Sequence, residues 1–237
     1  MVATMILAAA SSDGAEKLFT DGSDVSLSIV NHASFALKTP SVTILADPVG
    51  GGDKFKSFGS PDIILITDIH GDHMEPGTLK ALADEKTTIV APQAVVDKLP
   101  EDLKKKALVL ANGEVKSKSG IKIEALPMYN LTPERAQYHS KGRGNGYVLT
   151  IDKKRIYISG DTEDIPEMRK LKDIDVAFVC MNLPYTMTVQ QAASAVKEFK
   201  PRVVYPYHYR GSDIDQFKKE IGTEAGVEVR NRDWYVK

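Results

Sequence analysis

The chain is short of cysteine, of net charge and of long apolar runs, and each shortage removes a class of protein. Cys180 is the single cysteine among 237 residues, so an internal disulfide or a cysteine-based zinc finger cannot form. The 31 Lys and Arg residues nearly balance the 32 Asp and Glu residues, which leaves no strong basic field for nucleic acid or an anionic membrane. No stretch reaches the roughly 20 apolar residues of a membrane helix.

Hydrophobic residues make up 42% and charged residues 27% of the chain, the ordinary balance of a globular protein. We therefore expect a small-molecule substrate, no membrane span and no preference for nucleic acid. Formation of a homo-oligomer stays open. Cys180 follows an apolar run at 176–179, which favours a small core residue over a reactive thiol.

The first twelve residues combine a short apolar run with small residues, MVATMILAAASS. This pattern is similar to the end of a secretory signal peptide, although no basic residues precede the apolar run. We expect residues 1–24 to be a flexible N-terminus or a signal-peptide remnant and residues 25–237 to form a single domain. A periplasmic or secreted location and a cytoplasmic one both stay open.

Strand-like runs and strand–helix alternation occur in both halves of the chain. The predicted strands cover 25–30, 34–38, 42–46, 63–67, 87–91, 107–110, 121–126, 147–151, 155–159, 174–179, 203–205 and 227–230. The predicted helices cover 78–83, 93–98, 189–199 and 214–221. Two packed sheets with helices outside satisfy this α/β pattern. The longest irregular stretch is 130–145, and a loop of that length in a compact domain is usually functional.

The strongest chemical signal follows the wholly apolar run at 63–66. Asp68, His70, Asp72 and His73 stand within six residues, and Gly71 lets the loop turn tightly between them. Carboxylate oxygen and imidazole nitrogen are common ligands of zinc, manganese and iron. The alternative is a polar loop in which an aspartate caps the next helix.

Two further polar residues follow predicted strands. Asp161 ends Ser-Gly-Asp after 155–159, a pattern that by itself more often marks a turn or a cap. His208 follows 203–205 among tyrosines, where a lone histidine is usually structural. The chain has only five histidines, and three of them lie at strand ends beside acidic motifs, which favours one shared metal site.

The motif Asp68-x-His70-x-Asp72-His73 resembles the His-x-His-x-Asp-His signature of the metallo-β-lactamase superfamily. Asp161 matches that family's bridging aspartate, and His208 matches its final histidine. The stretches 31–35 and 46–48, together with Tyr185, resemble the branch of L-ascorbate-6-phosphate lactonase-like and N-acyl-phosphatidylethanolamine phospholipase D-like proteins. The resemblance implies a four-layer αββα sandwich of two mixed sheets with outer helices, and one or two divalent metals at one edge of the sheets. Zinc is favoured, with manganese or iron as alternatives.

The sequence departs from the family pattern at two positions. Asp68 stands where the signature begins with histidine, and Asn130 stands where the family supplies another histidine to the first metal site. By analogy the first site keeps only His70 as a nitrogen ligand, which moves its preference toward manganese, iron or magnesium. His139 in the long loop could replace the missing ligand or touch the substrate.

Two other residues are candidates for supporting roles. His32, with Asp47, could orient a metal ligand, or it could be a structural histidine at a strand bend. Tyr185 is a candidate for substrate contact or for support of the site.

These residues predict a metal-dependent hydrolase that uses a metal-bound hydroxide on an ester, a lactone or a phosphodiester. Asp72 or Asp161 would hold the hydroxide and accept its proton. Lys141 and Arg143, with Arg210, could counter a phosphate or carboxylate, or they could be solvated. The alternatives are a phosphodiesterase or nuclease and a non-catalytic, metal-binding descendant of the fold.

Overall fold

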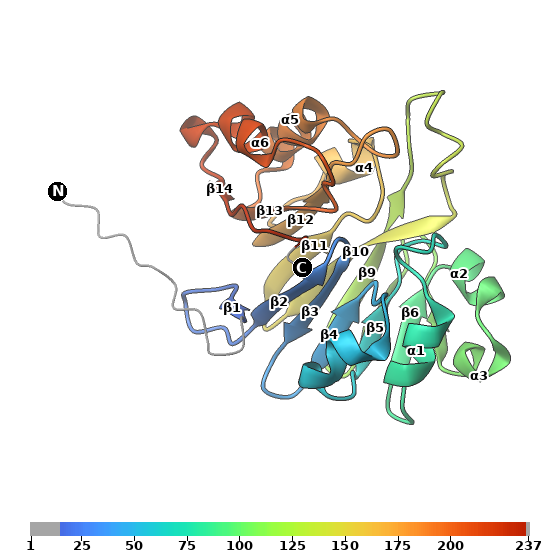
Figure 1. The fold of residues 1–237 in the computed structure, drawn as a ribbon. Coiled ribbons are helices and arrows are strands. Elements are labelled where there is room, and N and C mark those ends of the chain that lie inside the picture. Colours follow the sequence, from blue (N-terminus) through green and yellow to red (C-terminus); the bar gives the residue numbers. More distant parts are fainter. Residues whose placement is uncertain (1–14, 236–237) are drawn as a thin grey trace.

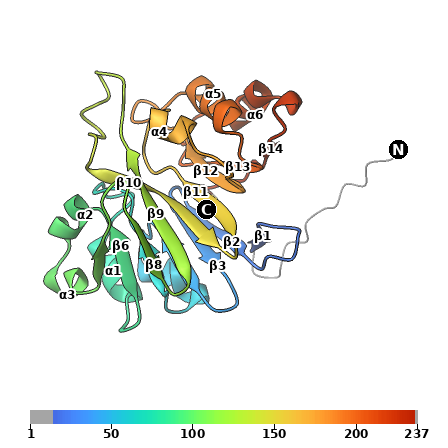
Figure 2. The same ribbon diagram turned by 180° about the vertical axis from the view of Figure 1, so that it is seen from behind.

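The strands form two seven-stranded sheets in the computed structural model, which describes residues 15–235 (Figures 1 and 2). The first sheet contains β1 Glu16–Lys17, β2 Ser26–Asn31, β3 Ser34–Lys38, β4 Thr43–Ala46, β5 Ile63–Leu65, β6 Thr88–Ala91 and β7 Ala107–Val109. The second contains β8 Val115–Lys118, β9 Ile121–Met128, β10 Gly144–Ile151, β11 Lys154–Ile158, β12 Val176–Cys180, β13 Val203–Tyr207 and β14 Glu228–Val229.

Each sheet is antiparallel in its first part and parallel in its second. In the first sheet β1 to β4 pair antiparallel and β4 to β7 pair parallel. In the second sheet β8 to β11 pair antiparallel and β11 to β14 pair parallel. Both sheets are therefore mixed, as expected.

The first sheet is apolar on both faces, and its alternating residues serve different layers. Ile44, Ile63 and Val90 belong to the large core between the two sheets. Leu45 and Ile64 belong to a separate outer cluster. This explains why 63–66 reads as an unbroken apolar run rather than as an alternating one.

Helices cover both outer faces (Figure 1). The first sheet is covered by η1 Gly52–Phe58, α1 Pro76–Leu82, α2 Gln93–Lys98 and α3 Glu101–Lys104. The second is covered by α4 Pro166–Arg169, α5 Val189–Phe199 and α6 Ile214–Ile221, and the short η2 Thr223–Ala225 follows α6. The layer order is αββα, which confirms the predicted fold class.

The structure adds short elements that the sequence pattern did not predict. They are β1, β8, α3, α4 and the two short 3₁₀ helices. The expected domain start at residue 25 is too late, because β1 pairs with β2 and Leu18 is buried in the core. The earlier part of the expected N-terminal segment, residues 1–14, lies outside the described residues.

One smaller expectation, the core position of Cys180, is confirmed, and a tight turn joins β10 to β11. The β10–β11 hairpin turns through Asp152 and Lys153, whose positive φ values of 47° and 69° fit a two-residue hairpin turn. Cys180 is buried, and burial raises the pKa of its thiol to about 12, as fits a core residue. Within residues 15–235, no helix has the length and apolar character needed to cross a membrane.

Candidate metal centre

Polar side chains from both sheets converge where strands end. Asp68, His70, Asp72 and His73 follow β5, Asp161 follows β11, and His208 follows β13. The ends of these parallel strands meet at one edge of the sandwich. The side chains form three overlapping triads: Asp68–His70–His139, His73–Asp161–His208 and His32–Asp72–His208. Within each triad the candidate ligand atoms lie within 4.8 Å of one another.

Asp72, His73 and His208 form what we call the second-site group. His73 Nε2 lies 3.3 Å from Asp161 Oδ2, and His208 Nε2 lies 3.3 Å from Asp161 Oδ1. Asp72 completes the group, because its Oδ2 lies 3.4 Å from His208 Nε2. Both imidazoles and Asp161 are almost fully buried, whereas the side chain of Asp72 is 45% exposed.

A buried carboxylate orients His73. Asp47 Oδ2 lies 2.8 Å from His73 Nδ1 and accepts a 2.7 Å hydrogen bond from the Thr67 hydroxyl. Desolvation opposes a charged His73, but Asp161 and Asp47 raise its pKa well above the ordinary value. A carboxylate on Nδ1 leaves Nε2 free to bind a cation in place of a proton.

His32 supports Asp72 in the same way. Its Nε2 lies 3.2 Å from Asp72 Oδ2, its Nδ1 lies 2.7 Å from the Tyr235 hydroxyl, and its ring lies 3.7 Å from that of His208. Burial opposes ionisation of Asp72, but hydrogen bonds to His208 and His32 lower its pKa. These contacts favour the supporting role for His32 over a purely structural one.

Several residues of the site have a strained backbone conformation, which orients their side chains. His32, Asp47 and His208 have positive φ values of 54°, 43° and 47°. Gly160, directly before Asp161, has φ of 61°, and a Cβ there would lie 3.1 Å from the Asn145 carbonyl oxygen. Non-glycine residues in this left-handed region cost about 1–3 kcal/mol each and cluster at functional sites.

Asp68, His70 and His139 form what we call the first-site group. His70 Nδ1 lies 2.8 Å from Asp68 Oδ2, and His139 Nε2 lies 3.8 Å from the same oxygen. His139 Nε2 also lies 3.4 Å from Asp161 Oδ2, so Asp161 contacts histidines of both groups. The structure thus places His139 of the long loop beside Asp68 and Asp161, where it could serve as the replacement ligand that the sequence left open.

Arg143 neutralises Asp68. Its Nε and NH2 groups donate to the two carboxylate oxygens at 3.1 and 3.0 Å, and NH2 lies 3.5 Å from His70 Nε2. Burial opposes ionisation of Asp68, but His70, His73 and Arg143 together lower its pKa. The Asp68–Arg143 pair is neutral overall, as a histidine would be.

Asn130 holds the loop, and its side-chain amide lies 3.3 Å from Nδ1 of His139 in the first-site group. Its side-chain amide donates to the carbonyls of Tyr185 at 2.7 Å and Arg135 at 2.9 Å. Its backbone N–H donates to the His139 carbonyl at 2.9 Å. These bonds account for an amide at a position where the family has an imidazole, and they fix the backbone of His139.

Glu163 is a loop anchor that the sequence reasoning missed. Its buried carboxylate accepts hydrogen bonds from the N–H groups of Leu131 and Thr132, both at 2.7 Å, and pairs with Arg135 at 2.6 Å. An acid two residues after Asp161, with an arginine in the long loop, was the available signal.

The donor set fits a bound cation. His73 Nε2, His139 Nε2, His208 Nε2 and Asp161 Oδ1 are buried and have no hydrogen-bond partner. Buried polar atoms are nearly always satisfied, so three unsatisfied imidazole nitrogens that each lie within 3.4 Å of the Asp161 carboxylate indicate a site that binds a cation. Mixed imidazole and carboxylate donors suit zinc, manganese or iron.

A cavity of about 220 Å³ opens above the two groups. The candidate metal ligands in its lining are His70, Asp72, His139, Asp161 and His208. Tyr138, Asn182 and Tyr185 line the rest. None of the three cations that the sequence offered for substrate binding lines the cavity. Lys141 pairs with Glu167 at 2.9 Å, and Arg143 pairs with Asp68 at 3.0 Å.

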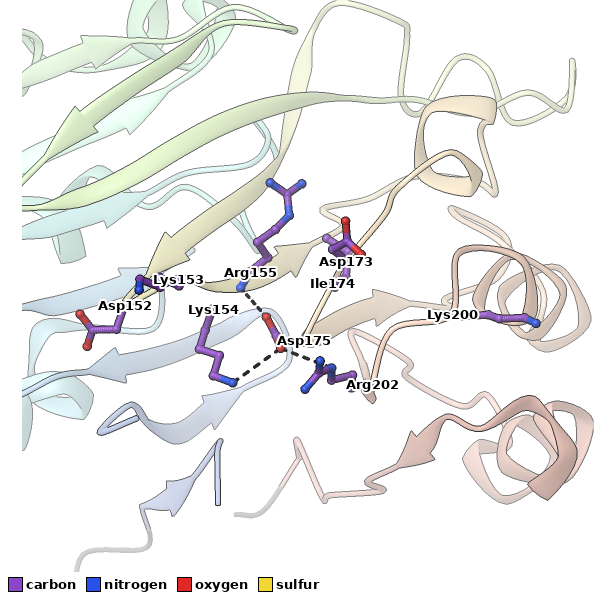
Figure 3. Close-up of a pocket in the computed structure, with 9 residues that line it drawn as sticks. All are labelled: Asp152, Lys153, Lys154, Arg155, Asp173, Ile174, Asp175, Lys200 and Arg202. Atoms are coloured by element: carbon purple, nitrogen blue, oxygen red, sulfur yellow. Dashed lines mark hydrogen bonds and ion pairs between the residues drawn. The ribbon is translucent and has the colours of Figure 1, made fainter. Parts of the chain in front are cut away.

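A second cavity, of about 530 Å³, lies at the opposite edge, where β11, β12 and β13 begin (Figure 3). Two of its charged residues, Lys154 and Arg202, form ion pairs with Asp175. Asp175 accepts from the Arg155 N–H at 2.9 Å and lies within 3.8 Å of Lys154 and Arg202. No histidine or cysteine lines this cavity, so the metal chemistry belongs to the other edge.

Sequence comparison gives the family. Residues 26–208 match the family model of the β-lactamase superfamily domain. The UPF0173 metal-dependent hydrolase of Pyrococcus abyssi is 31% identical over 220 residues, which cover 86% of this chain and 96% of that protein. Its counterpart in Thermococcus onnurineus is 31% identical over 217 residues, which cover 86% and 95%.

Structure comparison agrees. A Parabacteroides distasonis protein assigned as a metal-dependent hydrolase has a TM-score of 0.82 and 41% identity, and the match covers 95% of this chain and 96% of that one. Igni18, a metallo hydrolase of Ignicoccus hospitalis, has a TM-score of 0.73 at 22% identity and covers 90% and 96%, a likeness of fold alone.

The chain belongs to the metallo-β-lactamase superfamily, as its signature indicated. Within that superfamily it is a metal-dependent hydrolase, with histidines and aspartates placed to bind metal. The narrower lactonase-like and phospholipase D-like branch stays a prediction.

Proposed function

We propose that the chain hydrolyses a carboxylic ester or lactone at a two-metal centre. The first metal is bound by Asp68, His70 and His139, and the second by Asp72, His73 and His208. Asp161 joins the two sites. The observation that carries the proposal is the set of buried, unsatisfied nitrogen and oxygen atoms around Asp161.

A bound divalent cation would lower the pKa of water from 15.7 to about 7 and polarise the substrate carbonyl. The protein supplies the remaining functions. Asp161 is 3% exposed and contacts three histidines, which suits a ligand shared between sites. Asp72 faces the cavity with a half-exposed carboxylate, which suits the residue that orients the attacking water and takes its proton.

The neutral Asp68–Arg143 pair supports a functional first site despite the missing histidine. Asp68 adds one negative charge relative to a neutral imidazole. The Arg143 guanidinium, which donates to both oxygens of Asp68 at 3.0–3.1 Å, compensates that charge. The first site therefore keeps the charge of a histidine-rich site while it gains an oxygen donor. An oxygen donor favours a harder metal, so we propose zinc at the second site and zinc, manganese or iron at the first.

Metal counting on protein purified without chelator tests the proposal, with mass spectrometry as the readout. We expect two metals per chain in the wild type and at most one in His208→Ala, with unchanged circular dichroism. Hydrolysis should follow metal content when zinc or manganese is added back. A metal-free wild type that takes up neither ion would contradict the proposal and favour a non-catalytic descendant.

A further inference from the structure

The cavity above the metal centre offers a substrate no side-chain cation. Among the described residues that line it there is no lysine or arginine, while Asp72 presents a half-exposed carboxylate. The nearby Lys141 and Arg143 already pair with Glu167 and Asp68. Apart from the proposed metals, the lining therefore gives a phosphate or carboxylate group on the substrate no cationic partner, so the protein's own side chains do not favour an anionic substrate.

Exposed hydrophobic residues occur in the cavity lining and on the segments next to it in sequence. In the described part of the chain the exposed large hydrophobic residues are Val115, Leu131, Leu183 and Tyr185, each 47–48% exposed. Tyr185 lines the cavity and Leu183 follows the lining residue Asn182. Leu131 follows Asn130, whose amide donates to the Tyr185 carbonyl at 2.7 Å. Only Val115, on β8, lies elsewhere in the fold.

Two tyrosines form one wall. The rings of Tyr138 and Tyr185 lie 5.1 Å apart at 77°, an edge-to-face contact that holds both rings beside the metal ligands. Exposed apolar residues gathered at a concave site usually mark a binding surface. The volume of about 220 Å³ is below the roughly 300–1,000 Å³ of drug-sized pockets, so the substrate is small.

We infer that the site takes a small, uncharged ester or lactone whose apolar group packs against Tyr138 and Tyr185. This inference rests on the proposed hydrolase function and names its substrate class. Water oxygen adds to the carbonyl carbon, and the C–O bond to the alcohol breaks. The proton lost by water goes to the leaving alkoxide, so the products are a carboxylic acid and an alcohol.

Three substrates that share the same leaving group, p-nitrophenolate, test the inference on the metal-loaded full chain. The set is p-nitrophenyl acetate, p-nitrophenyl butyrate and bis(p-nitrophenyl) phosphate. Butyrate has two more methylenes than acetate, and their burial should raise kcat/KM about tenfold. We expect the anionic phosphodiester to be at least about tenfold poorer than butyrate.

Variants then locate the apolar contact. The butyrate-to-acetate ratio should fall toward one in Tyr185→Ala and in Tyr138→Ala, and stay at the wild-type value in Tyr185→Phe. Val115→Ala is the matched control, since its exposure is the same and it lies away from the cavity. Because both substrates are measured on one preparation, the ratio does not depend on the folded or metal-loaded fraction.

Different failures have different meanings. A ratio near one in the wild type, or one that neither tyrosine variant changes, would overturn the inference and leave the hydrolase proposal intact. A phosphodiester hydrolysed faster than butyrate would overturn the inference and the proposed ester or lactone reaction together, and would leave only the metal-dependent hydrolase. Metal-loaded protein that hydrolyses none of the three would overturn the proposed function and the inference together.

Discussion

The two halves of the metal centre are built differently. The second-site group lies mostly on buried strand ends, and His73 and Asp72 each have a dedicated partner, Asp47 and His32. The first-site group takes His139 from a loop and replaces a histidine by the Asp68–Arg143 pair. In the proposed two-metal centre, one half is therefore supplied by strand ends and the other by a loop histidine and a neutral ion pair.

Loss of the shared ligand should have the largest effect, because it breaks both halves. In Asp161→Ala we expect both metals to be lost. The rate of hydrolysis should fall by more than the 10–100-fold loss that is typical when a residue hydrogen-bonded to a metal ligand is removed. Metal content and kcat/KM are the measurements, and Asp97→Ala, at an exposed acid on α2, is the control. Retention of both metals would show that Asp161 does not join the sites.

Removal of the partner of His73 should separate the halves. Asp47→Asn keeps the volume but removes the charge that raises the pKa of His73. We expect second-site affinity for zinc to fall about 10–100-fold and first-site affinity to stay unchanged. Titration against a competing chelator measures both constants, and equal weakening of the two sites would refute independent support.

Loss of the loop anchor, Glu163, should weaken metal binding at the first site and leave the second site unchanged. Glu163→Gln weakens the bonds to Leu131 and Thr132 and the pair with Arg135, so the loop holds His139 less firmly. We expect first-site affinity to fall about tenfold, at the low end for residues that position a ligand, while second-site affinity is retained. Glu134→Gln, at an exposed acid of the same loop, is the control. If only the thermal stability falls, Glu163 is structural alone.

A change in the charge balance of the first site should have the smallest effect on metal binding. Arg143→Gln removes a positive charge beside Asp68 and leaves the carboxylate free for the cation. We expect first-site affinity to rise by about threefold to tenfold, the scale of one partly screened charge. A fall in affinity, measured by the same titration, would mean that Arg143 orients Asp68 more than it neutralises it.

The sequence predicted the second half of the centre better than the first, and the reason is physical. Asp72, His73, Asp161 and His208 follow strongly apolar strands, so their convergence follows from the sheet order. The position of His139 depends on contacts of Glu163, Arg135 and Asn130, which a single sequence does not reveal. The same limit applies to the fold: β8 is a polar VKSK strand, and β1 is held by distant arginines through Glu16.

The most direct test of the central claim, that His139 completes the first site, is the metal count of His139→Ala beside the wild type. Both proteins should be purified without chelator and measured by mass spectrometry. The account predicts two metals per chain in the wild type and one in the variant, held by the second-site group. Two metals in His139→Ala would contradict it and leave the loop histidine facing substrate alone.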